Sequence, residues 1–488
     1  MITHSPLQTD LYQLTMAAAY WHAGKAEQES VFHLFFRRLP FLGGYAIAAG
    51  LEPALEWMEA FRFRKEELEY LAGLRTKVDT PLFRRDFLNY LGELRLKLDI
   101  DAIPEGEAVF AHEPLLRVEG PILHAQLVET ALLNILNFQT LVATKAARIC
   151  GAAAGGPVIE FGYRRAQGPD GGLSASRAAC IGGCKGTSNV LAGQRYGLPV
   201  LGTHAHSWVM SFDDESEAFD RYAEAMPDNS TLLVDTYDTL GGVDHAITTA
   251  RLLRQRGHEL NGIRLDSGDL AWLSQQARAK LDAAGFPEVK IVASNDLDEH
   301  IIESLRHQGA RIDIWGVGTN LVTAADQPAL GGVYKLGALR SEDGTWQPRI
   351  KLSEQMAKSS IPGRLQVRRF EENGLLMADA IYDLDRGIPD EQVEIVDPGD
   401  TSRSKLIPAG TAFHDVLQPV MRDGKRVTAP ELLDMIRSRC KETVAKLHPG
   451  TTRLVNPHTF PAGLEQGLHD ARELLLAEYR QKRGKVVP

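Results

Sequence analysis

Cysteine is scarce in this chain, with four residues among 488. Cys180 and Cys184 lie four positions apart and would share a face of a helix. A structural zinc site would need a second pair of ligands nearby, and the sequence offers none. We therefore expect reduced thiols, as in a cytosolic protein, and neither a disulfide framework nor a metal site at these positions.

Long apolar runs and an excess of positive charge are also missing. No run approaches the ~20 apolar residues of a membrane-spanning helix. The first residues, MITHSPLQTDLYQLTM, lack the positive and then apolar pattern of a secretory signal. The net charge of −10 argues against non-specific nucleic-acid binding, which needs a basic surface. We expect a cytoplasmic protein that binds neither membranes nor nucleic acid, although a local arginine cluster could still bind anionic substrates.

The length is sufficient for two or three domains. Residues 1–125 combine helical periodicity with short β-like runs, which predicts an N-terminal α+β domain. Residues 126–344 alternate short apolar runs with amphipathic segments, which predicts the catalytic domain. Residues 345–488 lose this alternation and end in two charged amphipathic helices, over 429–447 and 462–482. We expect this last segment to pack on the N-terminal domain.

Short apolar or β-branched runs recur within the central region and are separated by helical stretches. The seven runs lie near residues 157, 198, 231, 262, 290, 313 and 332. This order is typical of parallel βαβ units, and seven in succession favour a barrel over an open sheet. The predicted fold class is α/β, with an irregular parallel α/β barrel and an additional α+β domain built from the N-terminal and C-terminal segments. Catalytic groups of such barrels lie where the strands end.

The first such strand end is followed by EFGYRRAQGPDGG. Arg164 and Arg165 could hold an anion through bidentate guanidinium contacts. The GPDGG stretch predicts a flexible loop whose backbone could approach a ligand. Strand ends carry polar turn residues in any protein, but arginine, histidine and phenylalanine are less well explained in this way.

The segment GTHAHSW places two histidines, His204 and His206, two positions apart after a strand. On extended backbone both would point to one side, so spacing cannot decide which faces a site. A metal site would need a third ligand, and a purely structural histidine is the other alternative.

Further along, GIRLDSGDL alternates Arg264 and Asp266 with apolar neighbours, so both could face the mouth of a barrel. Ser267 or Asp269 could instead be helix N-caps. GVGTN predicts either a phosphate-binding loop or an ordinary glycine turn.

Several strings together resemble one family, the nicotinate phosphoribosyltransferases. These are TDLYQLTM, EFGYRRAQGPDGG, SNVLAG, GTHAHSW, IRLDSGDL, ASNDLDE and GVGTNLVTA…ALGGVYKL. They occur in the family's order and cover most of residues 7–365. The resemblance implies formation of nicotinate mononucleotide and pyrophosphate from nicotinate and phosphoribosyl pyrophosphate. ATP would be a co-substrate, Mg²⁺ a cofactor, and the reaction a step of NAD salvage.

The resemblance also implies roles for residues around the pyridine ring. Arg264 and Thr203 match residues that contact nicotinate, and Phe161 matches an aromatic residue that stacks on its ring. Tyr12 matches a tyrosine that closes the ring from the partner subunit, which implies a homodimer with shared active sites. In nicotinamide phosphoribosyltransferase, the closest alternative, the position of Ser188 resembles an aspartate. A neutral serine there would not repel the carboxylate of nicotinate, which favours the acid as substrate.

At the phosphate side, His206 matches the histidine that ATP phosphorylates, whereas His204 carries no family role. Asp266 would lie beside the ribose and Mg²⁺, and Arg164 and Arg165 near the phosphates or the ring. The loop that holds the 5′-phosphate matches Gly316, Gly318 and Thr319. Quinolinate phosphoribosyltransferase shares the barrel type without needing a phosphorylated histidine. A non-catalytic nucleotide-binding barrel is the alternative from another class, and the presence of Arg264, Asp266 and His206 argues against it.

Overall fold

The computed structural model describes residues 4–351 and 360–484. The chain folds into two compact units. The first unit combines the chain up to Leu141 with the chain from Ala329 onward, and the second runs from Val142 to Pro328. Among the described residues, no helix is both long enough and apolar enough to cross a membrane.

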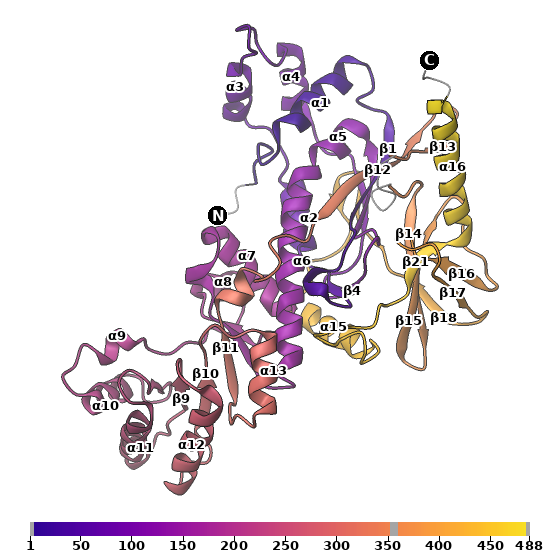
Figure 1. Ribbon diagram of the computed structural model, residues 1–488. Helices are drawn as coiled ribbons and strands as arrows, with labels where there is room; N and C mark the ends of the chain where they lie inside the picture. The colour runs from indigo at the N-terminus through magenta and orange to yellow at the C-terminus, as the bar shows by residue number, and fades with distance from the viewer. Residues whose placement is uncertain (1–3, 352–359, 485–488) are drawn as a thin grey trace. The chain divides into compact units, whose positions relative to one another are not determined.

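The described residues of the first unit contain an antiparallel sheet in the order β13-β12-β1-β5-β3-β19-β20, of which β1, β12 and β13 are labelled in Figure 1. Its strands are β1 (Glu29–Phe36), β3 (Asp99–Ala102), β5 (Leu116–Pro121), β12 (Gly332–Arg340), β13 (Trp346–Pro348), β19 (Gln418–Arg422) and β20 (Lys425–Arg426). The helices of its N-terminal part are α1 (Leu11–His22), α2 (Leu51–Glu59), α3 (Lys65–Gly73), α4 (Arg85–Glu93) and α5 (Ile122–Leu127). A small sheet pairs β2 (Ala46–Ile47) with β4 (Ala108–Val109). N-terminal and C-terminal segments therefore build one sheet together.

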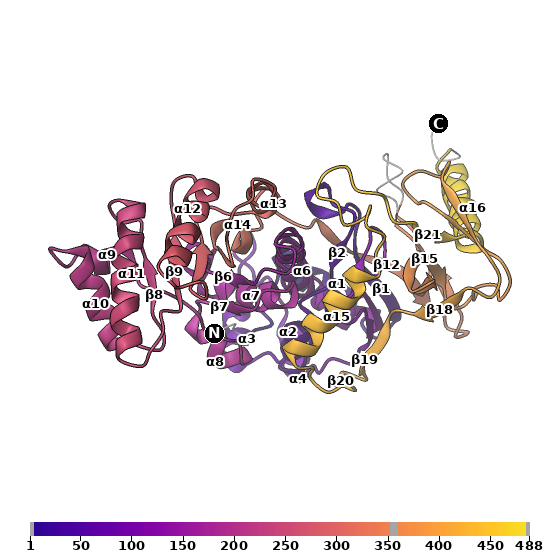
Figure 2. The same ribbon diagram turned by 90° about the horizontal axis from the view of Figure 1, so that it is seen from below.

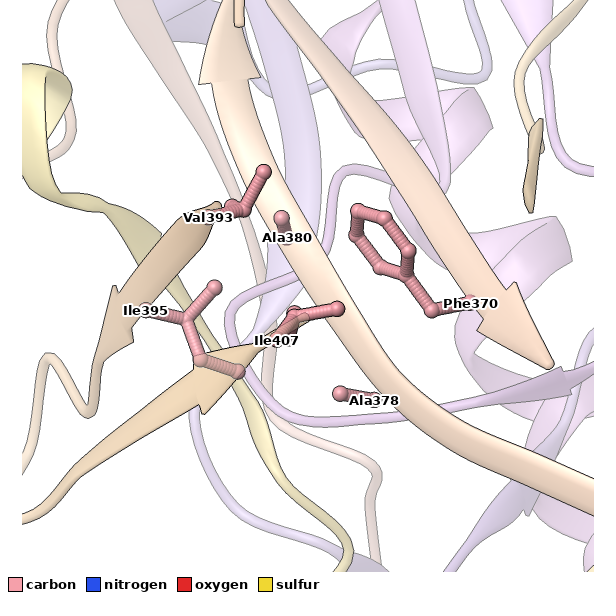
Figure 3. Packing of buried hydrophobic residues seen from close by; sticks show 6 residues of the cluster. All are labelled: Phe370, Ala378, Ala380, Val393, Ile395 and Ile407. Carbon is pink, nitrogen blue, oxygen red and sulfur yellow. The ribbon is translucent and has the colours of Figure 1, made fainter. Parts of the chain in front are cut away.

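A second large sheet of this unit follows the order β17-β16-β21-β15-β14-β18. Its strands are β14 (Leu365–Glu372), β15 (Leu375–Asp383), β16 (Val393–Val396), β17 (Ser404–Ile407), β18 (Ala412–Asp415) and β21 (Ala462–Glu465). Asn373 and Gly374, both with positive φ, form the two-residue turn between β14 and β15, as expected for an Asn-Gly hairpin. The inward side chains make a compact apolar cluster in which Phe370 packs near Ala378, Ala380, Val393, Ile395 and Ile407 (Figure 3). The two predicted C-terminal helices are present as α15 (Leu433–Ala445) and α16 (Gln466–Gly484).

The second unit is built on a curled parallel sheet, whose described strands follow the order β7-β6-β11-β10-β9-β8. The strands are β6 (Val158–Glu160), β7 (Gly186–Thr187), β8 (Thr231–Leu233), β9 (Gly262–Leu265), β10 (Lys290–Ala293) and β11 (Ile314–Val317). These neighbouring strands all pair in parallel, which confirms the α/β class and gives a half-barrel. The helix α6 (Glu129–Ala152) contains the point where the chain passes from the first unit to the second.

Helices alternate with these strands, as the sequence predicts. They are α7 (Gly168–Ile181), α8 (Val190–Tyr196), α9 (His206–Val209), α10 (Glu215–Ala225), α11 (Thr239–Gln255), α12 (Leu270–Ala283), α13 (Glu299–His307) and α14 (Thr319–Val322). Helices α10, α11 and α12 lie beside one another along the sheet (Figure 1 and Figure 2). Aspartate side chains accept a hydrogen bond from the first turns of α11, α12 and α13, at Asp238, Asp269 and Asp298. Asp269 is therefore an N-cap, one of the two interpretations left open for it.

Two of the seven predicted barrel runs are placed differently by the structure. The run near 332 is β12, which pairs antiparallel with β1 in the first unit and is no part of the parallel sheet. The run near 198 forms one isolated parallel bridge, between Val200 and Thr187, in place of a full strand. Strand β7, which that bridge extends, was not predicted, because its two residues have no apolar pattern. Local periodicity predicts a strand but not its partner, which depends on long-range packing.

Candidate active site

A hydrogen-bonded polar cluster surrounds Arg264 at the carboxyl ends of the parallel strands. This residue lies in β9, and its side chain is 15% exposed. Its Nε donates to Ser294 Oγ (2.8 Å), its Nη1 to Thr203 Oγ1 (3.0 Å) and its Nη2 to Asp266 Oδ1 (3.0 Å). The Cζ atom lies 5.7 Å from the centroid of the Phe161 ring. A guanidinium held by three neighbours in this way is pre-oriented, and its planar fork suits a carboxylate or phosphate.

Two carboxylates, Asp235 and Asp266, lie next to each other at this edge. Asp235 Oδ2 accepts from the backbone N–H of Asp266 (2.8 Å) and from Ser267 Oγ (2.7 Å). Asp235 Oδ1 is buried and has no hydrogen-bond partner among the described residues. An orphaned buried oxygen of this kind needs an explanation, such as a bound ion or ligand. Ser294 and Asp235 follow strand ends, where catalytic groups are expected, but neither was assigned a role of its own from the sequence.

The two histidines have different surroundings despite their close spacing. His206 begins α9, and its side chain is 39% exposed. Its Nδ1 lies 3.1 Å from Thr236 Oγ1, and its Nε2 lies 3.7 Å from Asp266 Oδ2. His204 is buried, and its Nε2 accepts from the backbone N–H of Leu233 at 3.2 Å. Burial lowers the pKa of His204. The structure thus places His206 in the polar cluster and His204 behind it.

Phe161 follows β6 and is held by a hydrogen bond from its backbone N–H to Val317 O (2.8 Å). Its ring lies against Gly316, where an added Cβ would come within 2.7 Å of ring carbons. Glycine is therefore required at 316 by the close approach of the ring. Gly318 is the N-cap of α14 and Thr319 is its first residue, so both also lie at this edge of the sheet.

Arg164 and Arg165 lie exposed on a short 3-10 turn, η2 (Tyr163–Arg165), directly after Phe161. The GPDGG stretch that follows is not a flexible loop as predicted. It forms the first turn of α7, beginning at Gly168 with Pro169 near its start. A proline in the first helical turn costs no hydrogen bond, so Pro169 is compatible with a helix that begins here.

A buried carboxylate, Glu160, holds the segments around Phe161 and Ser188. It accepts hydrogen bonds from Ser176 Oγ (2.9 Å), from Thr187 Oγ1 (2.5 Å) and from the backbone N–H of Gly162. The half-buried Ser188 donates its backbone N–H to Glu160 O at 2.8 Å. The aromatic residue and the serine therefore share one support.

Tyr12 belongs to the first unit and lies on α1. It is 47% exposed, and its hydroxyl donates to Glu129 Oε1 at 3.4 Å. The cluster around Arg264 is formed by the second unit alone. Among the described residues, no group of three or more His, Cys, Asp or Glu side chains is arranged to hold a metal ion.

Comparison with known proteins connects this arrangement to one family. The nicotinate phosphoribosyltransferase N-terminal domain matches residues 7–137, the family's central region matches 157–364 and its C-terminal domain matches 364–472. The chain is 46% identical over 469 residues to a nicotinate phosphoribosyltransferase of Bacillus subtilis (strain 168), covering 94% of this chain and 93% of the relative. It is 34% identical to a human nicotinate phosphoribosyltransferase, with 95% of each chain covered.

Solved structures give the same result. The crystal structure of human nicotinic acid phosphoribosyltransferase superposes with a TM-score of 0.83 at 32% identity, covering 96% of this chain and 99% of the human chain. A nicotinate-nucleotide pyrophosphorylase of Pyrococcus furiosus shares the fold, with a TM-score of 0.66 at 23% identity. The chain therefore belongs to the nicotinate phosphoribosyltransferase family.

Proposed function

We propose that this protein transfers the phosphoribosyl group of phosphoribosyl pyrophosphate to nicotinate, giving nicotinate mononucleotide and pyrophosphate for NAD salvage. ATP is hydrolysed in the same cycle through a phosphorylated His206. The observation that carries the proposal is the cluster in which Arg264, Asp266 and His206 meet at the carboxyl ends of β8 and β9. The names of the relatives agree with this chemistry.

Nicotinate would bind with its carboxylate toward the Arg264 guanidinium, forming a charge-assisted pair. Thr203 and Ser294 keep that guanidinium in place through their hydroxyl groups. Phe161, beside the guanidinium, would stack on the pyridine ring, and neutral Ser188 would add no repulsion. Tyr12 of a second copy would cover the other face of the ring, so the active form would be a homodimer.

The bond that forms joins the pyridine nitrogen to C1 of the ribose, while the bond from C1 to the pyrophosphate oxygen breaks. Pyrophosphate leaves with the electron pair, and positive charge develops on the ribose. The Asp266 carboxylate, fixed by Arg264 and Ser294, would stabilise that positive charge. Arg164 and Arg165 would meet the phosphates, and the ring held between two aromatics would be oriented for attack. The backbone N–H groups around Gly316, Gly318 and Thr319 would hold the 5′-phosphate.

Mg²⁺ fits the donor set at this edge. Mg²⁺ sites commonly use one or two carboxylates and complete their coordination with substrate phosphates and water. Asp235, with its buried and unpartnered Oδ1, and Asp266 beside it offer such a pair. When bound there, the ion would supply charge neutralisation to the leaving pyrophosphate.

The phosphate from ATP would be accepted by Nε2 of His206, since Nδ1 lies against Thr236. The Nε2–phosphorus bond forms as the bond between the γ-phosphorus and its bridging oxygen breaks, and ADP leaves. A phosphate at this position adds about two negative charges beside Asp266 and Arg264, which can reorganise the loops around phosphoribosyl pyrophosphate. Later attack by water on the phosphorus would return the histidine.

The decisive experiment measures mononucleotide formation from phosphoribosyl pyrophosphate with nicotinate or nicotinamide, each with and without ATP. We expect product with nicotinate and a rise in rate or yield on adding ATP. Preference for nicotinamide would instead support the nicotinamide-specific alternative. Absence of any product, with binding of nucleotide only, would support a non-catalytic barrel. Cell fractionation would check the expected cytoplasmic location.

A further inference from the structure

The curled sheet of the second unit ends in two edges, β7 on one side and β8 on the other. The segment 199–206 passes from one edge to the other. On the β7 side it is joined by main-chain hydrogen bonds, since Thr187 N donates to Pro199 O and Leu201 N donates to Thr187 O, both at 3.0 Å. It therefore acts as an additional, irregular strand beside β7.

On the β8 side the join is made by a side chain. The backbone N–H of Leu233 points away from β9 and donates to His204 Nε2 at 3.2 Å. The other ring nitrogen, Nδ1, lies 3.3 Å from the carbonyl oxygen of Ala205. A neutral imidazole with its proton on Nδ1 satisfies both contacts, because Nε2 must accept. In a protonated imidazole Nε2 would also carry a proton, so two donors would face each other and the hydrogen bond from Leu233 would be lost.

The surroundings keep this imidazole in place. His204 is 8% exposed, and its ring packs edge-on against Tyr222 at 4.8 Å and at a tilt to Phe219 at 6.2 Å, both in α10. Thr203, just before it, and His206, two residues after it, belong to the candidate active site. Thr203 accepts from Arg264, and His206 lies against Thr236, a few residues past the end of β8.

We propose that His204 is a positioning residue that closes the half-barrel: by accepting the Leu233 N–H, it holds the 199–206 segment against β8 and so places Thr203 and His206. This inference rests on the proposed function for the roles of those two residues. It gives a specific task to the histidine for which the family resemblance implies none. A side chain thereby replaces the main-chain pairing that a regular barrel has between its first and last strands.

The test compares His204→Leu, which fills the space but cannot accept, with His204→Gln, whose Oε1 can accept. Because a buried donor left without a partner is costly, His204→Leu should raise the nicotinate KM and slow His206 phosphorylation by about tenfold or more each. His204→Gln should recover both to within about threefold. The KM for phosphoribosyl pyrophosphate in reactions without ATP should change little, because the proposed 5′-phosphate loop lies on β11 and α14.

A matched control distinguishes positioning from general stability. His33 is also buried and also accepts a backbone N–H, from Leu365 at 3.1 Å, but in the first unit. His33→Leu should lower the Tm and leave the nicotinate KM unchanged. If His204→Leu behaved in the same way, with a lower Tm and normal constants for nicotinate and phosphorylation, the positioning role would be wrong.

A measurement on the unmodified protein covers the case in which His204→Leu does not fold. Residue-resolved hydrogen exchange should show the Leu233 amide protected at neutral pH, although it lies on the side of β8 away from β9. Rapid exchange of that amide would overturn the inference. An inactive wild-type protein with a protected Leu233 amide would instead contradict the proposed function alone, so the two failures are distinguishable.

Discussion

Replacement of Arg264 by alanine tests the proposed nicotinate site most directly. The guanidinium makes three hydrogen bonds to side chains from three different segments, and it is the cation closest to Asp266 in the described cluster. Without it, nicotinate would bring its carboxylate toward an uncompensated Asp266. We therefore expect the nicotinate KM to rise strongly, while the affinity for phosphoribosyl pyrophosphate changes less.

The size of the expected loss follows from how far Arg264 and Asp266 are buried, because the carboxylate of nicotinate would pair with Arg264 in the same surroundings. Arg264 is 15% exposed and Asp266 is 27% exposed at their side chains, so solvent screens the interaction only in part. Removing one partner of a buried, hydrogen-bonded charge pair typically costs about 2–5 kcal/mol. At about 1.36 kcal/mol for each factor of ten, this corresponds to a loss in kcat/KM for nicotinate of roughly 30-fold to several-thousand-fold.

The assay measures steady-state kinetics with nicotinate and with nicotinamide for wild-type protein, Arg264→Ala and Arg264→Lys. The ratio of kcat/KM for nicotinate to kcat/KM for nicotinamide should fall strongly in Arg264→Ala, because only nicotinate carries the negative charge. Arg264→Lys should recover only part of it, since an ammonium group cannot bond to three directions in one plane. Arg256→Ala, which removes a 52% exposed arginine paired with Glu224 on the surface, is the control and should be normal. A folded Arg264→Ala enzyme with wild-type nicotinate kinetics would remove Arg264 from the site.

Four further outcomes are expected. His206→Ala should fold, lose ATP hydrolysis and retain slow ATP-independent transfer. In the wild type, γ-labelled ATP should give an acid-labile, base-stable label on His206, and a label elsewhere would contradict the assignment. Sedimentation at assay concentration should show a dimer, because Tyr12 is expected to act in the partner's site, and an active monomer would argue against this. In the wild type, Arg369 Nη2 lies 2.7 Å from Oδ2 of the fully buried Asp379. Arg369→Met should lower the free energy of unfolding by about 3–5 kcal/mol, because it leaves that carboxylate without its cation. Burial lowers the pKa of His33 to about 3, so between pH 7 and pH 5 this histidine gains a proton in the unfolded chain but stays neutral in the folded chain. The difference in free energy of unfolding between wild type and His33→Leu, measured with urea, should therefore shrink by about 2 kcal/mol from pH 7 to pH 5.

Helices with a strong apolar period were predictable from the sequence, and breaks in them were less so. The apolar spacing from Leu127 to Ile149 predicts a helix, and the structure has α6 there, with bounds that differ by a few residues. Helical periodicity also runs from Glu52 to Leu74, but the structure has two helices there, α2 and α3, separated at residues 60–64. Phe61 and Phe63 in that break are both buried and pack against each other at 5.6 Å. Side chains two positions apart share a face on an extended segment and not on a helix, so the burial of both fits the break between the helices, which helical spacing does not reveal.

The choice between the two histidines could not come from spacing, because it depends on a distant strand edge. The Leu233 N–H, on the open side of β8, needs an acceptor in a buried place, and His204 supplies it. Once that ring is directed to β8, the start of α9 turns the chain so that His206 lies beside Thr236 and Asp266. The sequence limits the candidates to two, and tertiary hydrogen bonding assigns them.

Strand register explains why Asp235 and Ser294 join the site although the sequence assigned no role to either. Leu233 pairs with Arg264 in the parallel ladder of β8 and β9, so two residues further on Asp235 comes level with Asp266. Leu265 pairs with Ala293, so the next residue, Ser294, also comes level with Asp266. Parallel strands that end together therefore place three polar residues in one row, whatever the sequences between them. The chemistry of the site is encoded in residue types that can be read along the chain, and its geometry in the register that brings strands about thirty residues apart into one row.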